Sequence, residues 1–276
     1  MAKTQSAMTM RDALYEAPGP KTRRKMVVGT VISLAAVVAL LAFVVYRFWV
    51  TGQLSSRYWE LFSWRTPWVY LGRGLVGTFQ VALTAGVISL VLGMLLMLGR
   101  ISHVRPLSVL CAILTNFFRG VPSLLFIYGF FFVVPSLGFK MDSFWMLTIP
   151  ISLAASGVLA EVFRAGVNAV PRGQTEAGLS IGLSRWKVKT KIVLPQAIRF
   201  VIPSLISQLV VVVKDTALAY VVTFPDLMQN AQVLRTNYDA LVSTYLVVAV
   251  IYILINYLIN KASVYVSRRM DVKIIR

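Results

Sequence analysis

Residues 171–195 read PRGQTEAGLSIGLSRWKVKTKIVLP, a polar and basic stretch between long apolar ones. Pro171 is expected to end the apolar helix before it. Residues 174–181 then predict a short helix with Glu176 in its first turn, where a carboxylate suits the positive end of the helix dipole. Gly182 permits a sharp turn after that helix. The stretch therefore predicts a short helix that protrudes between two apolar helices.

A second basic segment completes this stretch. It starts at Ser184, continues with Arg185, Trp186 and Lys187, and is suited to lie along lipid headgroups. Pro195 is expected to begin the next apolar helix, because proline is tolerated at a helix start. Such a loop would be a rigid unit that transmits a push to the helices on either side of it.

The composition favours a membrane protein, because 58% of the residues are hydrophobic and only 14% are charged. A bilayer core of about 30 Å needs about 20 mostly apolar residues in a helix. The predicted fold class is therefore all-α, a polytopic membrane protein with about six transmembrane helices. The apolar runs that predict them cover about 26–46, 69–98, 107–134, 144–167, 192–213 and 241–259.

When the six runs cross the membrane in turn, most of the 28 Lys and Arg residues lie on one side of it, together with both termini and the 171–195 loop. Cytoplasmic loops are enriched in Lys and Arg, so this side is predicted to be the cytoplasm. The net charge of +18 is dispersed over the ends of the runs, so anionic lipid explains it better than nucleic acid. The predicted parts are a disordered cytoplasmic tail (1–25), an additional first transmembrane helix with an external linker (26–66), the main transmembrane domain (67–262) and a cytoplasmic C-terminal tail (263–276).

The order of residues in the loop resembles a known motif. Glu176-Ala177-Gly178 is followed by Gly182 and, after nine further residues, by Ile192-x-Leu194-Pro195. This pattern is similar to the EAA loop of permease subunits in binding-protein-dependent ABC importers. Gly178 stands where that family usually has alanine.

The resemblance covers roughly residues 70–261 and points to the polar amino acid uptake branch of the family. The blocks that carry it are 118–122 (FRGVP), 160–166 (AEVFRAG) and 214–218 (KDTAL), with mild departures at Val121 and Ala217. It implies a type I ABC importer permease fold in the plasma membrane. Residues 1–65 fall outside the resemblance.

In that family the loop docks into a groove on a separate ATPase subunit. The resemblance therefore implies a coupling role for Glu176, Ala177, Gly178, Gly182, Leu194 and Pro195. It also implies a pair of ATPase subunits, a second permease subunit that makes a heterodimer more often than a homodimer, and an extracellular binding protein. A merely amphipathic connector would fit the charges of the loop equally well.

The chain is not expected to be an enzyme. It contains no G-x-x-x-x-G-K-[ST] sequence to hold nucleotide phosphates, so ATP and Mg²⁺ are expected on the partner ATPase. Cys111 is the only cysteine and His103 the only histidine, and neither is predicted to bind a metal.

Four ionisable residues within apolar runs are predicted to line a substrate pathway, because each costs about 2.5 kcal/mol or more to insert. They are Arg119, Glu161, Lys214 and Asp215. Pro122 should kink the helix beside Arg119, and Gln208 should share a helix face with Asp215. The alternative is a set of structural ion pairs, for instance between Arg119 and Glu161.

An α-amino acid carries a carboxylate and an ammonium group, and this set of residues supplies both countercharges. Basic residues at the outer ends of the runs favour an acidic or neutral polar substrate; they are Arg57, Arg65, Arg73 and Lys140. The whole chain is similar to the glutamate-uptake permeases of actinobacteria, which implies glutamate. Two other classes stay open, an ion-gradient-driven amino acid transporter, although no internal repeat is seen, and a membrane scaffold protein.

Overall fold

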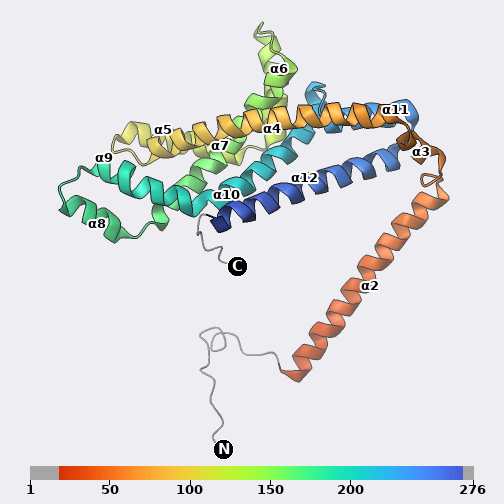
Figure 1. Ribbon diagram of the computed structural model, residues 1–276, viewed down its shortest axis with the longest axis horizontal. Helices are drawn as coiled ribbons and strands as arrows, with labels where there is room; N and C mark the ends of the chain where they lie inside the picture. The colour runs from red at the N-terminus through yellow and green to blue at the C-terminus, as the bar shows by residue number, and fades with distance from the viewer. Residues whose placement is uncertain (1–18, 270–276) are drawn as a thin grey trace, which may run out of the picture. The chain divides into compact units, whose positions relative to one another are not determined.

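The structure is a computed structural model that describes residues 19–269, with side chains as far as Tyr265 (Figure 1). The described residues form helices joined by short turns, without a strand, so the all-α prediction is confirmed. Two units can be distinguished, one up to Ser55 and one from Ser56 onward, and each is described by itself.

The first unit contains α2 (Pro20–Val50). Proline suits the first position of a helix, because the N–H groups there have no partner within the helix. None of the residues in α2 is buried, although the helix is apolar on every side, as a helix that faces lipid would be. Residues 20–25, which were predicted to be disordered, are helical, and the rest of the predicted tail, 1–18, lies outside the described residues.

The second unit contains the remaining helices. In chain order they are α3 (Arg57–Glu60), η1 (Leu61–Ser63), α4 (Arg65–Arg100), α5 (Arg105–Gly120), α6 (Ser123–Ser136), α7 (Ser143–Ala169), α8 (Arg172–Ser180), α9 (Arg185–Val188), η2 (Lys189–Val193), α10 (Leu194–Asp215), η3 (Thr216–Val222), α11 (Leu227–Tyr238) and α12 (Leu241–Arg269).

Helix α7 lies at the centre of this unit and packs against α4, α5, α6 and α10. Small residues make this possible, as they do in many membrane proteins. A Cβ atom on Gly157 of α7 would lie 2.7 Å from the backbone nitrogen of Arg119, so only glycine allows the end of α5 to come this close. The close contact fixes the position of Arg119 relative to the centre of the unit.

Among residues 19–269, five helices are long and apolar enough to cross a membrane, or six if α5 and α6 together make one crossing. These two helices correspond to the predicted third span, but they meet at an angle of 98°. Pro122 cannot continue the α5 hydrogen bonds, and Val121 before it is extended (φ −90°, ψ 128°). The predicted kink is confirmed, whereas the single continuous helix is not.

Two helix boundaries differ from the prediction. The chain becomes helical at Arg185, ten residues before Pro195, and continues through η2 into α10, so Pro195 does not begin this helix. A π-helical turn accommodates the proline, because the Leu194 N–H bonds the carbonyl of Lys189, five residues back. At the other end of the unit, α12 extends to Arg269, beyond the boundary predicted at residue 262.

Candidate functional site

The break between α5 and α6 exposes backbone polar groups inside the second unit. Helix α5 ends at Gly120 and α6 begins at Ser123, and no side chain caps the first turn of α6. At membrane depth such irregular backbone is tolerated where it lines a cavity or is buried in protein. Interrupted helices of this kind often surround the substrate sites of transporters.

A pocket of about 280 Å³ lies at this break. Arg119 reaches it from the end of α5, and Asp215 reaches it from the end of α10. Gln208 lies two helical turns before Asp215 and also lines the pocket, which agrees with the predicted shared helix face. The complete lining is Phe118, Arg119, Gly120, Val121, Pro122, Ser123, Ala154, Ala155, Val158, Gln208, Val211 and Asp215.

The two charged groups of the pocket are not neutralised by each other. Asp215 accepts a hydrogen bond of 2.8 Å at Oδ2 from the Ser123 hydroxyl. In the part of the chain that the structure describes, the ion pairs all belong to Glu161, so neither Arg119 nor Asp215 has one. A cation and an anion in one small pocket can bind a zwitterion, with its carboxylate on the guanidinium and its ammonium on the carboxylate.

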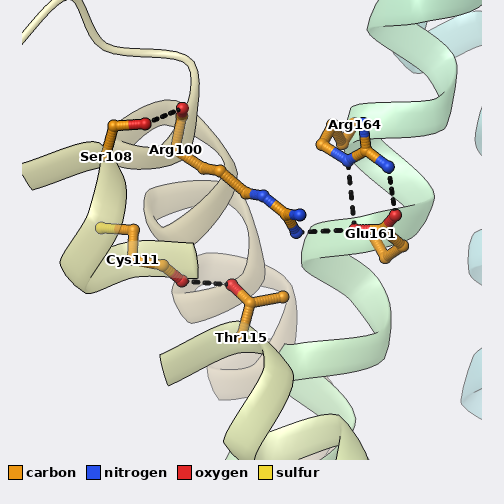
Figure 2. A network of polar contacts seen from close by, with 6 residues as sticks. All are labelled: Arg100, Ser108, Cys111, Thr115, Glu161 and Arg164. Carbon is orange, nitrogen blue, oxygen red and sulfur yellow. Dashed lines mark hydrogen bonds and ion pairs between the residues drawn. The ribbon is translucent and has the colours of Figure 1, made fainter. Parts of the chain in front are cut away.

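Glu161 lies elsewhere, in a polar network between α4 and α7 (Figure 2). Its Oε2 accepts a 2.8 Å hydrogen bond from Nη1 of Arg100 and one of 3.1 Å from Nε of Arg164, and its Oε1 is paired with Nη2 of Arg164. The alternative ion pair between Arg119 and Glu161 is therefore wrong, since Arg100 takes that place. Glu161 does not line the pocket.

Lys214 is also outside the pocket. It precedes Asp215 on α10, but it is exposed and is not among the residues that line the pocket. Of the four residues predicted for a substrate pathway, the structure thus brings together Arg119 and Asp215. It leaves Glu161 and Lys214 at other places in the fold.

The predicted coupling loop, residues 171–195, forms α8, the turn after it, α9 and η2. Glu176 is exposed and lies beyond the first turn of α8, which begins at Arg172, so the predicted placement in the first turn is wrong. The predicted turn at Gly182 is confirmed, with φ at +81°. The Gly182 N–H bonds the Leu179 carbonyl and the Leu183 N–H bonds the Gly178 carbonyl, which closes the end of the helix as a Schellman motif.

Gly178 is buried and connects α8 to the next helix. A Cβ atom there would lie 2.8 Å from Cδ1 of Ile192 and 2.9 Å from Cγ2 of Val188, so α8 is packed tightly against α9 and η2. Ala177 is exposed beside Glu176, Leu194 is half-buried at the start of α10, and Pro195 is exposed. The motif therefore has an outward part, Glu176 and Ala177, and a part that holds α8 in position.

Three residues with contacts at these places were not predicted from the sequence. They are Ser123, which binds Asp215, Arg100, which binds Glu161, and Lys189, which binds the carbonyl of Ile101. The position of Ser123, directly after the Pro122 break, was a usable signal, because serine is common at helix starts. The other two contacts join residues far apart in the sequence.

Residues 89–272 match the family described as binding-protein-dependent transport system inner membrane component. The chain belongs to this family. Among its relatives, the glutamate transport system permease protein GluD of Corynebacterium glutamicum is 33% identical over 227 residues, which are 79% of this chain and 82% of GluD. The L-cystine transport system permease protein TcyB of Bacillus subtilis is 30% identical over 214 residues, or 77% of this chain and 91% of TcyB.

Solved structures agree with this assignment. The crystal structure of an amino acid ABC transporter with histidines matches this structure with a TM-score of 0.69 at 25% sequence identity, over 72% of this chain and 94% of that one. The MetNI methionine ABC transporter in an inward-facing conformation has a TM-score of 0.62 at 20% identity, over 75% of this chain and 99% of that one, and supports the fold alone. The chain is an ABC importer permease subunit of the amino acid branch with the type I importer fold, as the resemblance predicted.

Proposed function

We propose that this permease subunit provides half of an ATP-driven import pathway for glutamate, and that the substrate passes through the pocket between Arg119 and Asp215. The observation that carries the proposal is the pair of opposite charges, unpaired with each other, on the wall of one pocket. Charged groups at membrane depth are costly, and a polar ligand that requires them accounts for that cost.

The size and chemistry of the pocket support a small zwitterion. Its volume of about 280 Å³ is at the lower end for ligand sites, so it suits a small solute. Arg119 can hold a carboxylate through two parallel hydrogen bonds, and Asp215 can accept from an ammonium group. Gln208 adds a neutral amide that can donate to a second carboxylate or bind a side-chain amide.

Glutamate is favoured over other amino acids by two further observations. The chain is 33% identical to a glutamate transport system permease protein. The basic residues predicted at the outer ends of the spans would attract an acidic solute; Arg57, Arg65, Arg73 and Lys140 are all exposed. Relatives named for cystine, arginine and glutamine make a neutral polar amino acid the second choice.

The energy for transport would come from a partner. In this proposal α8 is cytoplasmic, as are both termini, and its exposed Glu176 and Ala177 enter a groove on an ATPase subunit that carries ATP and Mg²⁺. Gly178, Gly182, Leu194 and Pro195 hold the helix in the docking position. A second, homologous permease subunit would complete the pathway as a heterodimer, and an extracellular binding protein would deliver the substrate.

Uptake of radiolabelled glutamate tests the proposal. Cells that lack the gene are compared with cells complemented by it, with unlabelled glutamine, aspartate, arginine and histidine as competitors. We expect saturable glutamate uptake to disappear with the gene, to return on complementation and to be blocked best by the close acidic analogue. Unchanged glutamate uptake would refute glutamate as the substrate.

A further inference from the structure

The C-terminal end of α4 is held by side chains from two other segments. The last carbonyl groups of a helix have no partner within the helix and carry partial negative charge. The Ser108 hydroxyl donates to the Arg100 carbonyl at 2.6 Å, and Nζ of Lys189 donates to the Ile101 carbonyl at 2.7 Å. A cation at this position is stabilised by the helix dipole as well as by the hydrogen bond.

Lys189 lies where three parts of the fold meet. Its side chain is half-buried in a small apolar site to which Ile101 at the end of α4 and Val167 of α7 contribute. Trp186 of α9 and Leu194 of α10 close the site from the segment to which Lys189 itself belongs. The methylene groups of the lysine can pack against these apolar side chains while its ammonium group reaches the end of α4.

Lys189 is also the first residue of the π-helical turn η2, which directly follows α9. Val188, its neighbour, contacts α8 at Gly178, as does Ile192 within the same turn. Single π-helical turns are frequent at functional sites, because they shift the register of the side chains that follow. The contact at Gly178 thus joins α8 to η2, and η2 holds the end of α4 through Lys189.

The end of α4 is in turn attached to the central helix. The side chain of Arg100 binds Glu161 of α7, as Figure 2 shows, and the two side chains are only about a quarter exposed. Three contacts therefore follow one another, from α8 to η2 at Gly178, from η2 to α4 at Lys189, and from α4 to α7 at Arg100. The central helix borders the pocket through Ala154 and Ala155.

We propose that Lys189 is a positioning residue that makes the end of α4 move with α8, so that a displacement of the docking helix reaches the pocket. The inference rests on the proposed function and deepens it. It assigns to one side chain the connection between the ATPase-docking helix and the helices around the substrate. A residue that served only stability would lower every activity of the complex in proportion.

The test uses the complete importer, with both permease subunits, the ATPase and the binding protein, reconstituted in liposomes. ATP hydrolysis is measured without substrate and with glutamate-loaded binding protein, together with glutamate uptake. For Lys189→Met we expect the stimulation by substrate to fall by about fivefold or more, a usual size for a coupling effect, with basal hydrolysis retained. Lys189→Arg, which keeps the cation, should retain most of the stimulation, and Lys189→Gln replaces the Met variant if that variant fails to assemble.

Lys187→Met is the matched control, because Lys187 is exposed in the same basic segment. Three outcomes would overturn the inference. They are wild-type stimulation in both neutral Lys189 variants, an equal loss of basal and stimulated hydrolysis, and the same loss of stimulation in Lys187→Met. These outcomes differ from a failure of the proposed function. In that case the wild-type complex itself would show neither stimulation nor uptake with glutamate.

Discussion

The Ser123 hydroxyl donates a 2.8 Å hydrogen bond to Asp215, and this bond joins the first residue of α6 to the last residue of α10. The pocket therefore lies where helices begin and end, and Arg119 stands one residue before the end of α5. Helix ends can move apart without unfolding a continuous helix. A small movement of α5 or α10 would change the separation of the Arg119 and Asp215 side chains.

Replacement of Arg119 by alanine should lower the maximal rate of glutamate uptake by about tenfold to hundredfold, because a charge-assisted hydrogen bond contributes about 1.5–3 kcal/mol. The rate is the informative quantity, since a separate binding protein would set the concentration dependence. Initial uptake rates measure it, with membrane levels checked by immunoblot. Arg105→Ala, an exposed arginine at the start of the same helix, is the control, and equal rates for both variants would make Arg119 a packing residue.

Asp215→Asn tests the anionic side of the pocket. The amide oxygen can still accept from Ser123, so the local structure is kept while the charge that would meet the ammonium group is lost. We expect glutamate uptake to fall about tenfold or more. Lys214→Gln changes the charge of the neighbouring exposed residue and should leave uptake near the wild-type rate. The pocket assignment fails if the two variants behave alike.

Glu161→Gln should act on stability and not on substrate selectivity, because Glu161 binds two arginines outside the pocket. Its side chain is 26% exposed, so the loss in the free energy of unfolding should be about 1 kcal/mol and not the larger value of a fully buried pair. Thermal unfolding of the purified protein gives this loss as a lower Tm. An altered pattern of inhibition by competing amino acids would instead return Glu161 to the substrate pathway.

Asp226 should make stability depend on pH. It is completely buried, lies outside the candidate spans and caps α11 by accepting from the Gln229 N–H at 2.7 Å. Burial raises the pKa of this carboxyl to about 6, against about 3.9 in an unfolded chain. The folded protein therefore binds the proton more tightly, and the stability gained from it is complete below about pH 4 and is lost as the pH rises through about 6.

Asp226→Asn should remove this dependence while keeping the helix cap. We expect its Tm to exceed that of the wild type above about pH 6 and the two Tm values to converge near about pH 4. The corresponding difference in the free energy of unfolding should be at most about 3 kcal/mol. Asp142→Asn is the matched control, since Asp142 caps α7 in the same way but is exposed. Parallel Tm curves for the wild type and Asp226→Asn would contradict the prediction.

Local signals predicted the elements of this fold well. Apolar length gave the spans, and Pro122 gave the break in the third, because both effects act within a few residues. The prediction that Pro195 begins a helix was wrong, because the chain is already helical from Arg185. The chain instead continues through it with a π-helical turn. The burial of Val188, directly before that turn, and of Val193, its last residue, stabilises this arrangement.

The partners of the charged side chains could not be predicted from the sequence. Glu161 is 61 residues from Arg100 and 42 from Arg119, and only the packing of α4 against α7 decides which of them it meets. The bond between Ser123 and Asp215 likewise spans 92 residues. Helix periodicity placed Gln208 and Asp215 on one face, but it could not show which helices would complete the pocket.

ATP-driven accumulation of radiolabelled glutamate in liposomes that contain the complete importer tests the central claim most directly. The wild-type complex should accumulate glutamate only with ATP inside the compartment that α8 faces. Glu176→Lys should abolish accumulation while the complex inserts normally, because the exposed α8 would lose its fit to the ATPase. Glu60→Lys, the same charge reversal at another exposed position, should leave accumulation unchanged. Accumulation without ATP, or full accumulation by the Glu176→Lys complex, would contradict the account.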